Sequence, residues 1–183
     1  VMLTQINYQT GELYDLEEIS SVAYKNGCVI IWDLAHSAGA IPIELEKSKC
    51  EFAVGCTYKF LNGGPGAPAF IYVRPDLIKN CYPILRGWLG HKHPFDFDMH
   101  FKKAETIDSM RIGTPPVIQM SILEKALEIW SDIDLEEVRK ESIKLSELFI
   151  KFEYKIEEDT EVNYDDKGFY NRSLIVSLLQ KFN

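Results

Sequence analysis

The feature that most constrains this chain is a short apolar run, Cys-Val-Ile-Ile-Trp, that ends in an aspartate and occupies residues 28–33. Continuous β-branched runs of this length are typical of strands buried on both faces. A carboxylate at the end of such a strand is costly to bury unless it meets a cation. The run therefore predicts a central strand with a polar site at Asp33, although a simple capping role for this aspartate is the alternative.

The segments around this run alternate between strand and helix. Residues 1–8 favour a strand, residues 15–27 favour a helix with Asp15 as N-cap and Gly27 at the C-terminal cap, and residues 50–58 favour another strand. This order predicts an α/β unit with a mainly parallel sheet. Ligands of such sheets lie beyond the carboxyl ends of the strands.

The second half of the chain is less regular. Residues 69–77 favour a further strand, while residues 80–117 are rich in aromatics, prolines and glycines and have no clear period. A loop of this length is usually functional or reaches a partner. A long helical stretch follows over residues 121–152, and we expect it to be broken near residues 132–134.

Composition excludes several classes of protein. The 183 residues are 46% hydrophobic and carry a net charge of −8, which favours a soluble globular chain and argues against nucleic acid as a partner. No apolar run is long enough to span a membrane, and the N-terminal residues do not resemble a signal peptide, so the cytoplasm is the predicted compartment. The four cysteines lack metal-site or disulfide spacing and are expected to be buried thiols.

Lys59 stands where a predicted strand meets a glycine-rich loop, Asn-Gly-Gly-Pro-Gly, that must be irregular. A surface lysine on a turn is the alternative interpretation. Because Asp33 and Lys59 both end predicted neighbouring strands, we expect them to meet in one crevice. An amine and an anion placed together in this way are what pyridoxal phosphate requires.

Four motifs then carry a family resemblance. The chain resembles kynureninase, a pyridoxal-phosphate enzyme of the aspartate-aminotransferase fold type, over roughly residues 1–150, through the runs WDLAHSAGA, CTYKFLNGGPGAPAF, GWLGH and GTPPV. The resemblance implies the central part of a fold-type I, α/β large domain with a mainly parallel sheet over residues 1–130. It also implies a connecting helix over residues 131–154 and the start of a small C-terminal domain over residues 155–183.

The resemblance implies hydrolysis of L-kynurenine, or of its 3-hydroxy form, to anthranilate or 3-hydroxyanthranilate and L-alanine. This reaction belongs to tryptophan catabolism and NAD biosynthesis. A homodimer with a cofactor site shared between subunits is also implied, with a small-molecule substrate and neither nucleic acid nor membrane as a partner.

Five residues acquire roles through the resemblance. Lys59 would be the Schiff-base lysine and the acid–base group at the substrate α-carbon, and Asp33 would pair with the pyridine nitrogen. His36 would lie against the cofactor, Tyr58 would contact the phosphate and serve as a candidate acid–base group, and Thr4 would line the pocket. Taken alone, His36 reads as a core or helix-end histidine and Tyr58 as a core aromatic.

Two further residues match positions that reach the cofactor from the other subunit, namely Trp88 and Thr114. The alternatives are core filling for Trp88 and a turn residue before proline for Thr114. His91 and His93 lack the spacing and the third ligand of a metal site, so no metal is predicted.

The sequence also departs from the family pattern. Kynureninases are much longer, and the small-domain arginine motif that binds the substrate carboxylate is not found here. Residues from about 155 onward match the family poorly, although Arg172 could belong to the start of that domain. We therefore expect this chain to be a fragment that is inactive alone. The alternatives are an aminotransferase-like or cysteine desulfurase-like enzyme, which would need a nucleophile such as Cys81, or a non-catalytic scaffold.

Overall fold

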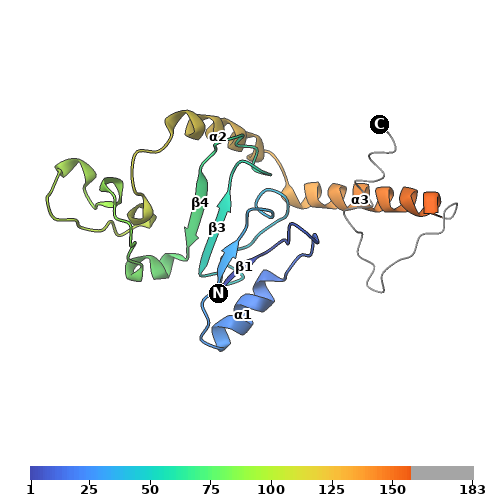
Figure 1. Ribbon diagram of the computed structural model, residues 1–183, viewed down its shortest axis with the longest axis horizontal. Coiled ribbons are helices and arrows are strands. Elements are labelled where there is room, and N and C mark those ends of the chain that lie inside the picture. The colour runs from blue at the N-terminus through green and yellow to red at the C-terminus, as the bar shows by residue number, and fades with distance from the viewer. Residues whose placement is uncertain (158–183) are drawn as a thin grey trace.

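The computed structural model of the chain describes residues 1–157 (Figure 1). Residues 158–183, which hold Arg172 and nearly all of the predicted small domain, lie outside the described residues. One sheet organises the described part, with strand order β1-β2-β3-β4. The first three strands are parallel and the fourth is antiparallel to the third. The strands are β1 (Met2–Thr4), β2 (Ile31–Asp33), β3 (Phe52–Cys56) and β4 (Ala69–Val73).

Helix α1 (Leu16–Lys25) connects β1 to β2 and begins and ends as the sequence predicts. The Asp15 carboxylate accepts a hydrogen bond from the Glu18 backbone amide at 2.8 Å, which satisfies a free donor of the first turn. Gly27, just beyond the helix, has a φ of 64°, the left-handed conformation that glycine adopts without strain. The connection is the helical crossover that two parallel strands require.

The core lies between α1 and one face of the sheet. Leu3, Trp32 and Ala53 occupy matching positions on neighbouring strands and pack in a cluster that includes Leu16. Trp32 is fully buried, and its indole nitrogen donates to the Ser20 hydroxyl at 2.9 Å. This hydrogen bond ties the central strand to the helix that covers it.

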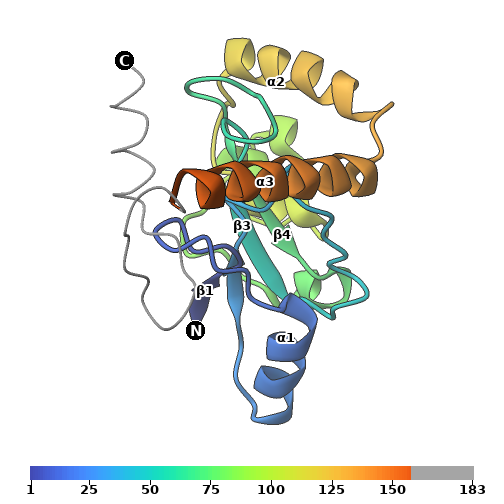
Figure 2. The same ribbon diagram turned by 90° about the vertical axis from the view of Figure 1, so that its right-hand side faces the viewer.

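The opposite face of the sheet corrects one prediction. Residues 28–33 were expected to be buried on both faces, yet the side chains of Val29 and Ile31 are exposed. The physical reason is that α1 packs against the face that carries Trp32, through Leu16 and its neighbours, and leaves the other face open at these residues. Figure 2 shows α1 and the strands from a second side. Residues 45–49, between β2 and β3, form turns.

The predicted break in the long helical stretch is confirmed. Helix α2 (Val117–Trp130) ends before the expected break, and α3 (Leu135–Glu157) begins after it and projects away from the sheet in Figure 1. The Asp134 carboxylate accepts a hydrogen bond from the Glu136 amide at 2.9 Å at the start of α3. None of the described helices is long and apolar enough to cross a membrane.

The segment between β4 and α2 contains short 3-10 turns rather than helices or strands, in agreement with its lack of period. It runs out to the left of the sheet in Figure 1. The turns are η1 (Pro75–Asn80), η2 (Trp88–Gly90), η3 (Pro94–Asp96) and η4 (Ile107–Met110).

Candidate functional site

Asp33 and Thr4 lie side by side at the carboxyl edge of the parallel strands. They are register partners across β1 and β2, so both side chains belong to one face of the sheet. The Asp33 carboxylate accepts a hydrogen bond from the Ala35 amide at 2.9 Å, so the capping interaction weighed as its alternative is present. Asp33 is half-buried and forms no ion pair within the described residues. The second carboxylate oxygen accepts no hydrogen bond from the described residues.

His36 and Lys59 meet over this edge. The turn after β2 carries His36 and the turn after β3 carries Lys59, and their Nε2 and Nζ atoms are 2.8 Å apart. The sequence predicted that Asp33 and Lys59 would share a crevice at neighbouring strand ends. In the structure, His36 makes the direct contact with the lysine, three residues after the aspartate.

Close backbone packing holds the two turns together. A side chain at Gly39 would place its Cβ 2.8 Å from the carbonyl carbon of Phe60. The turn after β2 therefore packs directly against the backbone of the turn after β3. The Cβ of a residue at Gly63 would lie 2.9 Å from the Thr57 carbonyl oxygen and 3.1 Å from Leu123 of α2. The distances to Phe60 and to the Thr57 oxygen are shorter than real Cβ contacts, and the distance to Leu123 is tight, so these glycines allow the loop around Lys59 to close.

The irregular backbone predicted after Lys59 is confirmed. Asn62, Gly64 and Gly66 all have positive φ values, and the Gly63 amide donates to the Thr57 carbonyl at 2.8 Å. Asparagine is among the few side chains that adopt the left-handed region readily. The loop therefore reverses the chain directly after the lysine and leads it into β4.

Tyr58 is half-exposed and lies next to the lysine. The Lys59 Nζ is 5.5 Å from the centre of the Tyr58 ring, within range of a cation–π contact. The alternative of a buried core aromatic does not apply, because half of the Tyr58 surface is accessible. Its ring is available to a ligand that approaches Lys59.

Trp88 and Thr114 do not join this cluster in the single chain. Trp88 is exposed on η2 and packs edge-on against Phe95 with ring centres 5.7 Å apart. Thr114 is exposed between η4 and α2. No hydrogen bond, aromatic contact or cation–π contact among the described residues joins either one to Lys59, and both side chains are exposed.

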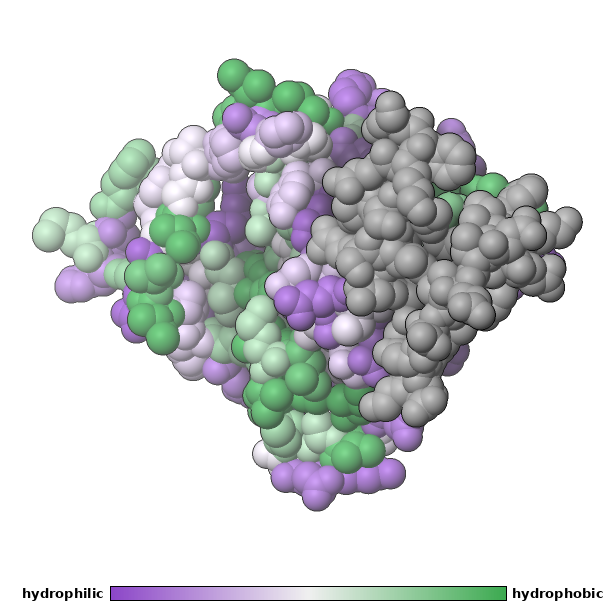
Figure 3. Space-filling view, turned by 45° about the vertical axis from the view of Figure 1, so that its right-hand side comes forward, coloured by the Kyte–Doolittle hydropathy of each residue, from purple (hydrophilic) through white to green (hydrophobic). Residues whose placement is uncertain are grey.

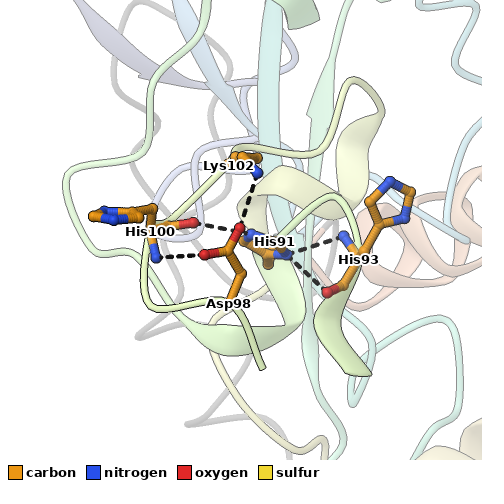
Figure 4. Close-up of polar contacts among 5 residues, drawn as sticks. All are labelled: His91, His93, Asp98, His100 and Lys102. Atoms are coloured by element: carbon orange, nitrogen blue, oxygen red, sulfur yellow. Dashed lines mark hydrogen bonds and ion pairs between the residues drawn. The ribbon is translucent and has the colours of Figure 1, made fainter. Parts of the chain in front are cut away.

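His91 is a structural residue of the irregular segment. Its ring nitrogens lie 2.8 Å from the His93 carbonyl oxygen and 3.3 Å from the His100 carbonyl oxygen, as Figure 4 shows. Asp98 accepts hydrogen bonds from Lys102 Nζ and from the His100 amide, and the bond from Lys102 is the main reason that the pKa of Asp98 is lowered. No cluster able to hold a metal ion occurs in residues 1–157.

Tyr8 is a contact residue that the sequence analysis missed. Its ring stacks on the His36 imidazole, with ring centres 6.2 Å apart and planes inclined by 25°. The signal available in the sequence was the turn motif Asn-Tyr-Gln-Thr-Gly at residues 7–11, shortly after β1. That motif predicts a turn but does not say which strand end the tyrosine faces.

Comparison with known proteins agrees with this arrangement. The Aminotransferase class-V family matches residues 1–166. A kynureninase of Deinococcus radiodurans is 39% identical over 174 residues, which cover 92% of this chain and 42% of the relative. A kynureninase of Pseudomonas fluorescens is 38% identical over 151 residues, covering 82% of this chain and 36% of the relative. The chain thus spans about two fifths of the length of these relatives.

Solved structures support the fold. An apo cysteine desulfurase from Thermococcus onnurineus aligns with a TM-score of 0.72 at 19% identity, covering 99% of this chain and 47% of that one. The cysteine desulfurase CsdA from Escherichia coli aligns with a TM-score of 0.60 at 25% identity over 74% of this chain and 33% of that one.

The predicted resemblance to kynureninase and the predicted α/β fold class are both confirmed. The chain belongs to the aminotransferase class-V family and is kynureninase-like, and this membership indicates pyridoxal phosphate as its cofactor.

Proposed function

We propose that this chain carries the cofactor-binding centre of a kynureninase-like hydrolase. The reaction is hydrolysis of L-kynurenine or 3-hydroxykynurenine to anthranilate or 3-hydroxyanthranilate and L-alanine, a step of tryptophan catabolism and NAD biosynthesis. The observation that carries the proposal is the Lys59 amine, held 2.8 Å from His36 at the edge of the sheet where Asp33 and Thr4 also lie. The relatives at 38% and 39% identity give the reaction class.

The side chains at this edge fit pyridoxal phosphate. The half-buried Asp33 has no cationic partner in the described residues, and a protonated pyridine nitrogen would be such a partner. Lys59 supplies the amine that holds the cofactor, and Thr4 adds a hydroxyl on the same face as Asp33. When bound, the cofactor supplies the electron sink for carbanion chemistry.

Each residue then has a specific task. Lys59 moves the proton at the substrate α-carbon, and His36 orients the lysine amine through their direct contact. Tyr58, half-exposed beside Lys59, would contact the cofactor phosphate and would provide a hydroxyl for proton transfer at the β-carbon. Asp33 keeps the pyridine nitrogen protonated through its charge.

We further propose that the site is completed in a homodimer. Trp88 and Thr114 are exposed and lie apart from Lys59 in the single chain, which is the arrangement expected if they serve the partner's site. The cytoplasm remains the predicted compartment on the sequence grounds given above. The cysteine desulfurase alternative would need a nucleophile such as Cys81, a free and partly exposed cysteine directly after η1.

The proposal is tested by adding pyridoxal phosphate to the purified chain, recording the absorbance spectrum, reducing with borohydride and mapping the labelled peptide. We expect a visible band and a label on Lys59, both lost in Lys59→Ala and retained in Lys25→Ala, a control at an exposed lysine of α1. A label spread over several lysines, or one that survives Lys59→Ala, would contradict the assignment. A scaffold function would survive Lys59→Ala, and kynurenine cleavage by the chain alone would contradict the prediction that it is inactive.

A further inference from the structure

The orientation of His36 is under-determined by its hydrogen bonding. Within the described residues, its ring makes one hydrogen bond, with Lys59. A protonated lysine can only donate, so His36 Nε2 is the acceptor in that state. Rotation of an imidazole about its Cβ–Cγ bond has broad energy wells, so a single hydrogen bond leaves the ring plane loosely fixed. A second contact is needed to keep Nε2 directed at the lysine.

Tyr8 supplies that contact. Its ring centre lies 6.2 Å from that of His36 with an angle of 25° between planes, which is within the range of favourable stacked pairs. The Tyr8 side chain is 65% exposed, so it is not held by burial in a core. The His36 ring is therefore bracketed by Lys59 at one nitrogen and by Tyr8 at its face.

The backbone that carries Tyr8 is firmly built. Ile6 and Leu13 form an antiparallel bridge, the Asn7 amide donates to the Glu12 carbonyl at 2.9 Å, and the Gly11 amide donates to the Asn7 carbonyl at 2.8 Å. These bonds close a tight hairpin directly after β1. The backbone hydrogen bonds of this hairpin, and not packing in the core, hold Tyr8 next to the turn after β2.

We propose that Tyr8 is a positioning residue, whose ring fixes the plane of the His36 imidazole so that Nε2 remains aimed at the Lys59 amine. Its role in turnover rests on the proposed function of Lys59, but the contact itself exists without any cofactor. The aromatic ring of Tyr8, and not its hydroxyl, makes the contact with His36. In the described residues the hydroxyl accepts a hydrogen bond only from the neighbouring Gln9 side chain, at 3.1 Å. Tyr8→Phe should therefore preserve the effect, and Tyr8→Leu should remove it.

The test uses the full chain without cofactor. An amine-reactive acylating reagent is applied at one fixed pH, and peptide mass spectrometry gives the labelling of Lys59 relative to Lys25. We expect Tyr8→Leu to raise this ratio about two- to tenfold, because a ring–ring contact shifts an equilibrium by about that factor. The imidazole proton resonances of His36 should also shift in the NMR spectrum, since the neighbouring ring current is lost.

Two control variants make the result specific. Tyr8→Phe should leave the ratio and the resonances near their wild-type values. Tyr24→Leu removes a tyrosine of α1 that is 70% exposed and should change neither. An unchanged ratio in Tyr8→Leu, or an equal change in Tyr24→Leu, would overturn the positioning role.

Cofactor labelling in the same variants separates this inference from the proposed function. If wild-type Lys59 takes no cofactor while Tyr8→Leu still raises its acylation, the positioning role stands and the proposed function fails. If the cofactor labels Lys59 while the acylation ratio is insensitive to Tyr8→Leu, the proposed function stands and the positioning role fails.

Discussion

Gly63 shows how one missing side chain shapes the loop that carries Lys59. The space a Cβ would need is already filled by Ala67, the Thr57 carbonyl and Leu123 of α2. The sequence predicted irregular backbone here from the density of glycine, and the positive φ values confirm it. The crowding at Gly63 depends on a helix sixty residues further along the chain, so no local pattern could have revealed it.

We expect Gly63→Ala to lower the free energy of unfolding by about 1–3 kcal/mol, because overpacking of a closed site forces its neighbours to shift. Gly113→Ala is the matched control, since a Cβ at Gly113 would meet nothing within 4 Å. Urea unfolding followed by tryptophan fluorescence gives both values. Equal midpoints for the two variants would show that the loop relaxes around the added methyl group.

Cys50 makes stability depend on alkaline pH. Its side chain is fully buried, and burial raises the pKa of its thiol from 9.0 to about 11. Above pH 9 the unfolded thiol ionises while the folded one keeps its proton, so the folded state binds more protons and stability falls as pH rises.

We therefore expect the wild type to lose stability between pH 9 and 11 more steeply than Cys50→Ala, by at most about 1.4 kcal/mol per pH unit. Urea midpoints at several pH values in this window measure the two slopes. Because other groups titrate there in both proteins, the difference between slopes is the informative quantity. Parallel slopes would mean that Cys50 ionises equally in both states.

At the scale of elements, the sequence predicted where helices begin and end better than it predicted which side chains of a strand are buried. The Asp15 cap and Gly27 are local features, and the structure has both. The exposure of Ile31 depends on what covers the sheet, which no run of β-branched residues encodes. The stacking of Tyr8 on His36 likewise joins two turns that are distant in sequence.

The cap of α1 gives a prediction at this scale. Asp15→Ala should lower the free energy of unfolding by about 0.5–2 kcal/mol, because the Glu18 amide loses its acceptor. Asp15→Ser should retain most of the stability, since serine also caps well. Thermal unfolding by circular dichroism compares the three proteins, and an Asp15→Ala variant as stable as Asp15→Ser would show that the cap contributes little.

At the scale of the whole molecule, hydrophobic side chains lie at the surface, as Figure 3 shows. Several belong to the segment between β4 and α2, where Ile84 is 97% and Met99 is 95% exposed. Exposed apolar patches of this kind mark interaction surfaces. The same segment carries Trp88, so the surface and the proposed shared site occupy one part of the chain.

We expect the double variant Ile84→Lys/Met99→Lys to weaken self-association of the chain at least about tenfold, because charged side chains are depleted from the cores of protein interfaces. Sedimentation equilibrium of the variant, the wild type and the control Tyr24→Lys measures this. Association that is unaffected by the double variant, or abolished equally by the control, would argue against this segment as the homodimer interface.

The order of strands in the sheet is also their order along the chain, and every pairing joins consecutive strands. Within residues 1–157, each strand after β1 therefore finds its partner already synthesised, and none of these four strands pairs with a strand that is distant in the chain order. Because short sequence separations cost little loop entropy, the sheet is suited to grow stepwise from β1 to β4. The turns bearing His36 and Lys59 are then completed in succession, so the proposed cofactor-binding edge forms as the chain emerges.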